Sequence, residues 1–490
     1  MKSTNINLLP NQVNSSPDYF CTWQSQLYIS NNAGVQEQRD SLTEKTIFGS
    51  EYSGGWVDFY NCKEDLIFML DDSWDIPIGD TVDNSLLFGS LILDKERFPS
   101  FSGKGIENRD AMKKLSEAIK AKGWRGVGGW VCAQKAKAFA DKPEEEYWIN
   151  RLKWSDYADW LYWKVDWGVQ GESIDFRRML NRLQKEYAPN LTLNQAMTEE
   201  LTPECKVFRT YDVPAIMSIP MTMEKLKRVL QYNAKPGCDA LVDCEDEAYV
   251  AAALGCVMGI MRHPRVGNLP NGNPDPSFPA LHRNIKKKTD EVARAARWHR
   301  IAPAFSVNGD NTFFDSNILT DTWKVEKQEE EIEAWWKYKN GDTIIKAGPA
   351  RISRGIKPPV VKPDKNGLVP FMVASKNPSG AVSVATLGRT LGREWITPRC
   401  NVVLDAEESN LIGIFGEYAA LTIYSSTIKS SARILAQDLL SDKAVDITDD
   451  LKIKENHIKI DGEIIHNVGT AAGHLNDTSE PGMMLKISEN

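Results

Sequence analysis

Carboxylate side chains follow several short apolar runs in this 490-residue sequence. The acids at or just after the ends of these runs are Asp71, Asp72, Asp166, Asp212, Asp243 and Glu245. Glycoside hydrolysis needs two carboxyl groups flanking one sugar, and a retaining enzyme uses one as nucleophile and the other as acid/base. A single acid at a strand end is also a common N-cap of the next helix. Because the pattern recurs at several strand ends, it favours one mouth lined with carboxylates.

Metal-assisted hydrolysis is the competing chemistry, since carboxylates also hold Mg²⁺ or Ca²⁺. The sequence has only six histidines, and of these only His263 lies in a suitable loop position. Neither an H-x-H nor an H-E-x-x-H pattern occurs. We therefore expect no metal and no other cofactor, because the protein's own acids suffice for hydrolysis.

Tryptophans support a sugar substrate. Of the fifteen in the chain, five lie on or just after the apolar runs: Trp23, Trp74, Trp130, Trp163 and Trp167. Aromatic faces match the C–H faces of a pyranose ring, although tryptophans also simply fill the core of a barrel. We expect Trp74 and Trp167, which adjoin acids, to be sugar platforms and Trp163 to be a core residue.

The apolar runs alternate with amphipathic helix patterns. Six runs are clear, at residues 65–70, 126–131, 160–165, 191–193, 206–208 and 240–242. A seventh lies around residues 20–24, and the eighth has no clear position. Continuous apolar runs are typical of parallel strands buried on both faces, and helices between them indicate βα repetition. No Gly-rich turn follows the first run, so the pattern predicts a (β/α)8 TIM barrel rather than an open Rossmann sheet.

The pattern of apolar and polar residues changes after about residue 317. Alternating segments such as residues 381–385 replace the helix patterns, and Asp461-Gly462 predicts a hairpin between two alternating halves. We therefore divide the chain into a catalytic barrel, residues 1–312, and a C-terminal antiparallel β-sandwich, residues 313–490. The sandwich is expected to brace the barrel rather than to bind sugar.

Composition narrows the classes of function. The chain is 42% hydrophobic and 26% charged, as in globular proteins, and its net charge of −8 disfavours nucleic acid as the main partner. No run approaches the eighteen apolar residues of a membrane-spanning helix. The N-terminus has no apolar leader, so we expect a cytoplasmic protein or an exported one already trimmed. Eight cysteines without a C-x-x-C pair indicate reduced thiols.

Between about residues 20 and 265 the sequence resembles the α-galactosidase (melibiase-type) clan of retaining glycoside hydrolases. The resemblance rests on the order and spacing of short motifs: Thr22-Trp23, Leu70-Asp71-Asp72-Ser73-Trp74, Glu96-Arg97-Phe98-Pro99, Lys122-Gly123-Trp124-Arg125-Gly126, Lys164-Val165-Asp166 and Arg209-Thr210-Tyr211-Asp212. It implies a barrel followed by a β-sandwich and an exo-acting α-glycosidase.

The resemblance also implies roles for individual residues. Asp166 would be the nucleophile and Asp212 the general acid/base. The residues expected to contact or orient the sugar are Trp23, Asp71, Asp72, Trp74, Lys164, Trp167, Asn194, Arg209 and Asp243. A cation beside Asp166 should lower the pKa of that carboxyl and keep it ionised, whereas the acid/base should have less positive support. Arg209 close to Asp212 conflicts with this unless its guanidinium contacts substrate or Asp166.

Two departures from the family pattern leave alternatives open. The stretch from Arg209 to Asp212 is one residue shorter than in the family, so Asp243 and Glu245 are substitutes for the acid/base. Asn194-Gln195-Ala196 stands where the family selects its sugar and matches no familiar α-galactosidase. The expected function is an α-galactosidase-like retaining glycosidase acting on a glycoside or oligosaccharide. The alternatives are action on α-glucosyl or β-L-arabinopyranosyl groups, or a carbohydrate-binding member without turnover.

Overall fold

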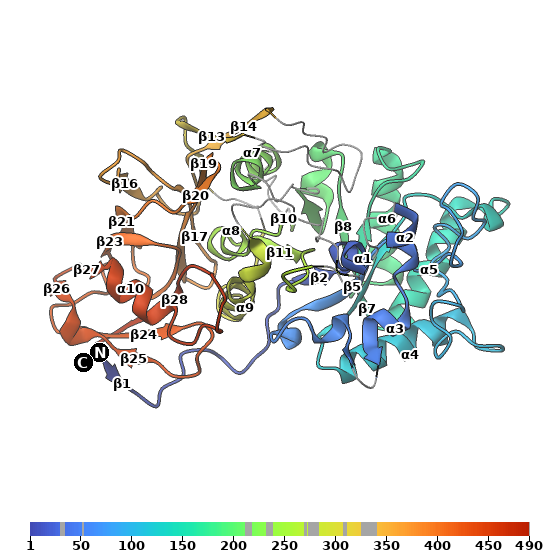
Figure 1. Cartoon of the computed structure of the whole chain (residues 1–490), viewed down its shortest axis with the longest axis horizontal. Coiled ribbons are helices and arrows are strands. Elements are labelled where there is room, and N and C mark those ends of the chain that lie inside the picture. The colour runs from blue at the N-terminus through green and yellow to red at the C-terminus, as the bar shows by residue number, and fades with distance from the viewer. Residues whose placement is uncertain are drawn as a thin grey trace.

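The computed structural model describes residues 1–29, 35–50, 53–210, 218–231, 239–268, 272, 284–306, 311–324 and 341–489 (Figure 1). Eight parallel strands form a closed barrel: β2 (Tyr19–Cys21), β5 (Ile67–Leu70), β6 (Gly126–Val131), β7 (Trp160–Val165), β8 (Thr192–Gln195), β9 (Val207–Arg209), β10 (Leu241–Glu245) and β11 (Val257–Ile260). Each strand pairs with the next, and β11 pairs with β2 to complete the ring. The predicted barrel is confirmed.

The strand with no clear position in the sequence is β11. It follows α8 (Ala248–Leu254), a fully buried helix without a polar face. The helix and the strand therefore form one almost unbroken apolar stretch, in which neither the helical nor the strand period of apolar residues can be recognised. Gly255, with φ of 67°, ends the helix in the left-handed conformation that glycine adopts without strain.

Five longer helices cover the outside of the described part of the barrel. They are α4 (Asn108–Ala121), α5 (Glu144–Tyr157), α6 (Ile174–Tyr187), α7 (Ser218–Gln231) and α9 (Thr289–Trp298). Three short helices, α1 (Trp23–Ile29), α2 (Val35–Asp40) and α3 (Glu44–Phe48), fill the connection between β2 and β5. No helix in the described part of the chain is both long and apolar enough to cross a membrane.

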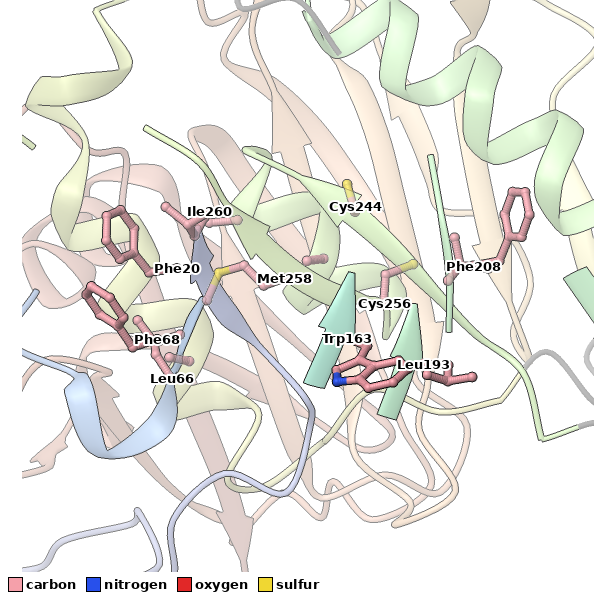
Figure 2. Close-up of a cluster of buried hydrophobic side chains, with 14 of the residues drawn as sticks. Phe20, Leu66, Phe68, Trp163, Leu193, Phe208, Cys244, Cys256, Met258 and Ile260 are labelled. Atoms are coloured by element: carbon pink, nitrogen blue, oxygen red, sulfur yellow. The ribbon is translucent and has the colours of Figure 1, made fainter. Parts of the chain in front are cut away.

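Side chains of the barrel strands alternate between two cores. Phe20, Phe68, Trp163, Leu193 and Phe208 point outward and pack with the helices (Figure 2). The alternate positions point inward, where an interior cluster contains Tyr19, Cys21, Ile67, Met69 and Tyr162. Because a strand has a period of two, residues two or four positions beyond these also face the barrel interior.

The C-terminal part is a sandwich of mixed sheets. A nine-stranded sheet has the order β1 (Lys2–Ser3), β25 (Val445–Asp446), β24 (Arg433–Asp438), β28 (Gly482–Ser488), β22 (Leu411–Phe415), β18 (Val382–Leu387), β17 (Phe371–Lys376), β15 (Arg351–Arg354) and β12 (Thr312–Phe314). A five-stranded sheet has the order β16 (Val360–Lys362), β21 (Cys400–Asp405), β23 (Tyr418–Tyr424), β27 (His457–Asp461) and β26 (Lys452–Lys454). The second core lies between them, with Val384 and Ile414 from one sheet and Leu421 and Ile460 from the other.

Two features of the sandwich differ from the sequence expectation. Several neighbours run parallel, among them β15 with β17 and β18 with β22, although most pairs are antiparallel. In addition, β1 pairs with β25, so the first residues of the chain join the C-terminal sheet (Figure 1). A third sheet of four strands, β14 (Thr343–Pro349), β13 (Ile318–Lys324), β19 (Arg389–Gly392) and β20 (Glu394–Ile396), lies beside α7.

The barrel and the sandwich meet at α8 and α9. The hydroxyls of Ser375 and Ser383 donate to the carbonyl of Ala253 at 2.8 and 3.0 Å, and Arg354 donates to the carbonyl of Leu254 at 2.9 Å. These contacts satisfy carbonyls at the end of α8 that have no partner within the helix. The sandwich therefore supports the barrel directly.

Candidate active site

The two-residue period of the barrel strands explains why the charged side chains of this site lie together. Asp71 lies two residues after the inward-facing Met69, and Asp166 lies four residues after Tyr162, two beyond Lys164. The carboxyl ends of the strands form the mouth where barrel enzymes hold their catalytic groups. Asp71, Lys164 and Asp166 are all buried at this end, with 3%, 2% and 5% of their surfaces exposed.

Both carboxylate oxygens of Asp166 are held by donors from other strands. Arg209 donates from Nη2 to Oδ1 at 2.8 Å, and the indole of Trp130 donates to Oδ2 at 2.8 Å. Burial alone would raise the pKa of Asp166, but the charges of Arg209 and Lys164 and these two hydrogen bonds outweigh it. The pKa lies below its usual value, so Asp166 is ionised and fixed in orientation.

Lys164 is paired with Asp71 rather than with Asp166. Its Nζ lies 2.9 Å from Oδ2 of Asp71, and the thiol of Cys21 donates to the same oxygen at 2.8 Å. Burial and the neighbouring Asp71 raise the pKa of Cys21, which keeps the thiol protonated and able to donate. The strands β2, β5 and β7 are thus joined by one buried polar cluster at the mouth.

Arg209 bridges two carboxylates. Besides the hydrogen bond to Asp166, its Nη1 lies 3.7 Å from Oε1 of Glu245. The guanidinium therefore contacts Asp166, one of the two partners that the sequence analysis names for it. Asp212 itself lies outside the described residues, as does the rest of the segment 211–217.

Asp243 and Asn194 are fully buried, and the strand register sets them opposite Arg209 and Lys164, respectively. Oδ2 of Asp243 accepts hydrogen bonds from the Tyr19 hydroxyl at 2.8 Å and from the Asn194 amide at 2.7 Å. The same amide donates to the Tyr162 hydroxyl at 2.7 Å. Burial raises the pKa of Asp243 to about 6. The structure thus brings both predicted residues together in one buried hydrogen-bond network.

The division of the tryptophans into core residues and candidate sugar platforms differs from the sequence expectation. Trp74 has 1% of its surface exposed, packs against Trp160 at a centroid distance of 5.3 Å, and donates to the carbonyl of Trp130. It is a core residue, which corrects its expected role as a sugar platform. Trp167 is half-buried and contacts Trp130 at 5.8 Å. Trp23, also half-buried, packs against the interior cluster at the start of α1.

Two contacts of the site involve residues to which the sequence argument gave no such role. The sequence pattern places Trp130 only among the strand tryptophans, but its register opposite the inward-facing Lys164 directs the indole to the site. Arg39 of α2 donates to Oδ2 of Asp72 from Nε at 3.0 Å and from Nη2 at 2.8 Å. No local pattern links a helix residue to an acid 33 positions later.

The carboxylates of this site are engaged by cations of the protein itself, namely Lys164, Arg209 and Arg39. In the ranges that the structure describes, no group of three or more His, Cys, Asp or Glu side chains is arranged to hold a metal ion. The arrangement provides an ionised, oriented carboxylate beside buried hydrogen-bonding groups, which suits nucleophilic attack and recognition of hydroxyls.

Comparison of the sequence with known proteins gives no match. No protein-family profile matches the chain, and no curated protein is significantly similar to it.

Solved structures do resemble the chain. A GH27 β-L-arabinopyranosidase from Geobacillus stearothermophilus is 9% identical, with 96% of each chain covered and a TM-score of 0.41. The α-galactosidase from Saccharomyces cerevisiae with raffinose is also 9% identical, with 96% of this chain and 98% of that chain covered and a TM-score of 0.35.

Proposed function

We propose that this protein is a retaining glycoside hydrolase that removes terminal α-linked sugars by double displacement. The observation that carries the proposal is the environment of Asp166. Its carboxylate lies at the end of a barrel strand, is 5% exposed, and is held by Arg209 and Trp130 at 2.8 Å each. An oriented carboxylate with a lowered pKa is ionised at neutral pH and suited to attack an anomeric carbon.

In the first step Asp166 attacks the anomeric carbon while the acid/base protonates the departing glycosidic oxygen. In the second step the acid/base takes a proton from water, and this water displaces Asp166 from the sugar. We assign the acid/base to Asp212, which follows Arg209 by three residues. A retaining mechanism requires the two carboxyl groups to lie about 5–5.5 Å apart. Asp243 and Glu245 are the alternatives for this role.

We expect galactose as the sugar, bound by Asp71 and Asp72 and stacked on Trp23 or Trp167. Carboxylates accept hydrogen bonds from sugar hydroxyls, and an aromatic ring buries the C–H face of a pyranose. An α-glucosyl or β-L-arabinopyranosyl group is accommodated by the same machinery, and Asn194 is the residue expected to discriminate among them.

A panel of 4-nitrophenyl α- and β-glycosides, compared between the wild type and Asp166→Asn, tests the proposal. We expect release from the α-galactoside and a loss of at least about 1,000-fold in the variant. Asp156→Asn, which neutralises an exposed acid on α5, is the matched control and should retain full activity.

Covalent labelling identifies the nucleophile independently. An activated cyclitol epoxide should add its mass to the peptide that contains Asp166 in the wild type and to no peptide in Asp166→Asn. Labelling of Glu245 or Asp243 instead would overturn the assignment. Sugar binding without turnover or labelling would identify a binding protein rather than an enzyme.

A further inference from the structure

Asp72 is held from outside the barrel. It follows Asp71 directly, just beyond the end of β5, and the side chain is met by helix α2. Arg39 donates twice to Oδ2, at 3.0 and 2.8 Å, and the hydroxyl of Ser73 donates to Oδ1 at 2.7 Å. Asp72 is 3% exposed and the Arg39 side chain 13%. Both carboxylate oxygens are therefore oriented by donors from the protein.

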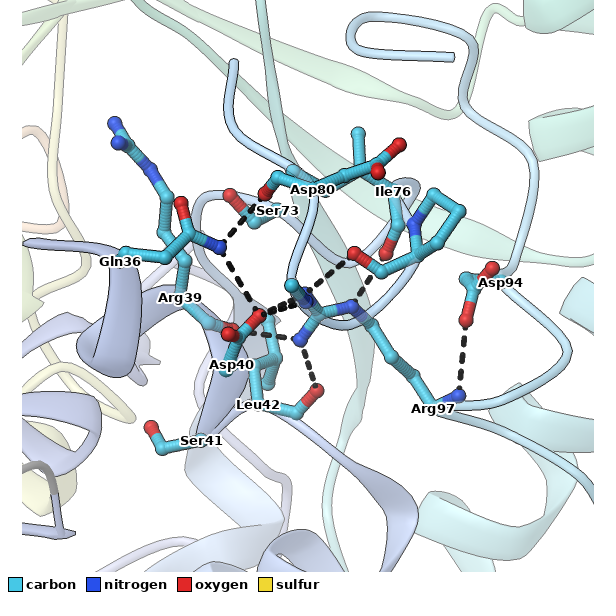
Figure 3. Close-up of polar contacts among 12 residues, drawn as sticks. Gln36, Arg39, Asp40, Ser41, Leu42, Ser73, Ile76, Asp80, Asp94 and Arg97 are labelled. Atoms are coloured by element: carbon cyan, nitrogen blue, oxygen red, sulfur yellow. Dashed lines mark hydrogen bonds and ion pairs between the residues drawn. The ribbon is translucent and has the colours of Figure 1, made fainter. Parts of the chain in front are cut away.

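The position of Arg39 is fixed in turn by Arg97, whose side chain is fully buried (Figure 3). Its guanidinium donates to the backbone carbonyl of Arg39 at 2.6 Å and to that of Leu42 at 3.1 Å, and it pairs with Asp40 at 3.0 Å. Its Nε donates to the carbonyl of Ile76 at 2.5 Å. One side chain thus joins the end of α2 to the loop that follows Asp72.

The charge of Arg39 matters because Asp72 is buried. Burial raises the pKa of Asp72, and Arg39 together with the Ser73 hydroxyl opposes that shift. Without the guanidinium the burial effect would be uncompensated, and the carboxyl would take up a proton nearer to neutral pH. A protonated carboxyl loses acceptor capacity towards a sugar hydroxyl.

We propose that Arg39 is a positioning residue of the sugar site, which keeps Asp72 ionised and oriented for a sugar hydroxyl, and that Arg97 anchors α2 so that Arg39 reaches it. This inference rests on the proposed function, since it assigns the groups that support one of the expected sugar-binding acids. According to this inference, helix α2 and the loop that contains Arg97 also determine the affinity for the sugar.

Steady-state kinetics on the 4-nitrophenyl glycoside that the wild type hydrolyses best test the inference. For Arg39→Gln we expect KM to rise about 10–100-fold with kcat changed less than about fivefold, because a charged hydrogen bond used in binding is lost. The acidic limb of the pH profile of kcat/KM should move to higher pH. Arg39→Lys keeps the charge and should recover most of the affinity.

Two further variants separate positioning from a general structural effect. Asp72→Asn and the double variant Arg39→Gln with Asp72→Asn should share the same KM, because Arg39 acts only through Asp72. Arg178→Gln, which breaks an exposed ion pair with Glu204 on the barrel surface, is the matched control and should change nothing. Additive losses in the double variant would overturn the inference.

If Arg39→Gln folds poorly, calorimetric titration with galactose still tests the inference. The affinity of Arg39→Lys for galactose is then compared with that of Asp72→Asn. A wild type that is active, with Arg39→Gln and Arg39→Lys indistinguishable from it, overturns this inference alone. A wild type that neither hydrolyses a glycoside nor binds a sugar overturns the proposed function and this inference with it.

Discussion

The indole N–H of Trp130, on β6, lies 2.8 Å from Oδ2 of Asp166, which follows the neighbouring strand β7. Arg209, from β9, takes the other oxygen at the same distance. A carboxylate held at both oxygens has one orientation, and these donors help to keep the pKa of Asp166 below its usual value. The pairing of Trp130 with Lys164 in the strand register brings the indole to this position.

We expect Trp130→Phe to impair the site without unfolding the protein. Loss of the indole donor removes one of the contributions that lower the pKa of Asp166, so this pKa rises and the acidic limb of kcat/KM moves to higher pH. A charge-assisted hydrogen bond of about 1.5–3 kcal/mol predicts a loss of about 10–100-fold in kcat/KM. The control Trp163→Phe removes an equivalent buried bond to Ser155, 3.0 Å long and away from Asp166. Equal effects of the two variants would refute the assigned role.

Asp75 predicts a dependence of stability on pH. Its carboxyl is 4% exposed and accepts a hydrogen bond from the Leu91 amide at 3.1 Å, and burial raises its pKa to about 7. The folded protein binds this proton more tightly than the unfolded chain, so stability is lost as pH rises from about 4 to about 7.

The effect of Asp75→Asn on the free energy of unfolding should therefore differ between pH 8 and pH 4. It should be more stabilising at pH 8, by up to about 4 kcal/mol. Thermal unfolding at the two pH values measures the difference, with Asp156→Asn as an exposed control. The interpretation fails if Asp75→Asn has the same effect at both pH values.

The sequence predicts the barrel well because a parallel strand buried on both faces is a continuous apolar run. The runs at residues 126–131 and 160–165 coincide with β6 and β7 in full. The strand β11 was missed because α8 before it is equally apolar, and a buried helix of seven residues carries no periodic pattern.

The site was predictable only where strand geometry extends to it. Asp71, Lys164 and Asp166 continue the inward positions of β5 and β7, so their proximity follows from the period of two. Trp74 lies beyond the end of β5, where that period no longer applies, so its position close to Asp71 and Asp72 in the sequence does not indicate the direction of its side chain. The contact of Arg39 with Asp72 depends on how α2 packs, which no local pattern encodes.

An ion pair at the interface of barrel and sandwich should stabilise the fold strongly. Arg294 of α9 binds Asp438 of β24 through Nε at 2.9 Å and Nη2 at 3.1 Å, and both side chains are 1% exposed. Removing one partner leaves an uncompensated buried charge, so Asp438→Ala should cost about 3–5 kcal/mol. The exposed pair of Arg178 and Glu204 is the comparison, and Glu204→Ala should cost at most about 1 kcal/mol. Chemical denaturation measures both, and a similar cost for the two would contradict the prediction.

The Asp461-Gly462 pair predicts a hairpin, but that prediction is wrong. The strand β27 ends at Asp461 and the helix α10 (Gly462–Gly469) begins at Gly462. A Cβ atom on Gly462 would lie 1.8 Å from the carbonyl oxygen of Tyr418. The glycine is therefore required by the close approach of α10 to β23, and not by a turn.

Gly462→Ala should consequently destabilise the sandwich, because the carbonyl that it meets belongs to a strand paired on both sides and cannot move freely. Forcing an extra methyl group into a packed contact costs about 1–3 kcal/mol. Gly103→Ala is the matched control, since its Cβ would lie at an ordinary 3.5 Å from Ile106. Thermal unfolding should show a lower midpoint for Gly462→Ala and little change for Gly103→Ala. Equal midpoints would mean that α10 can shift away from β23 without loss of packing.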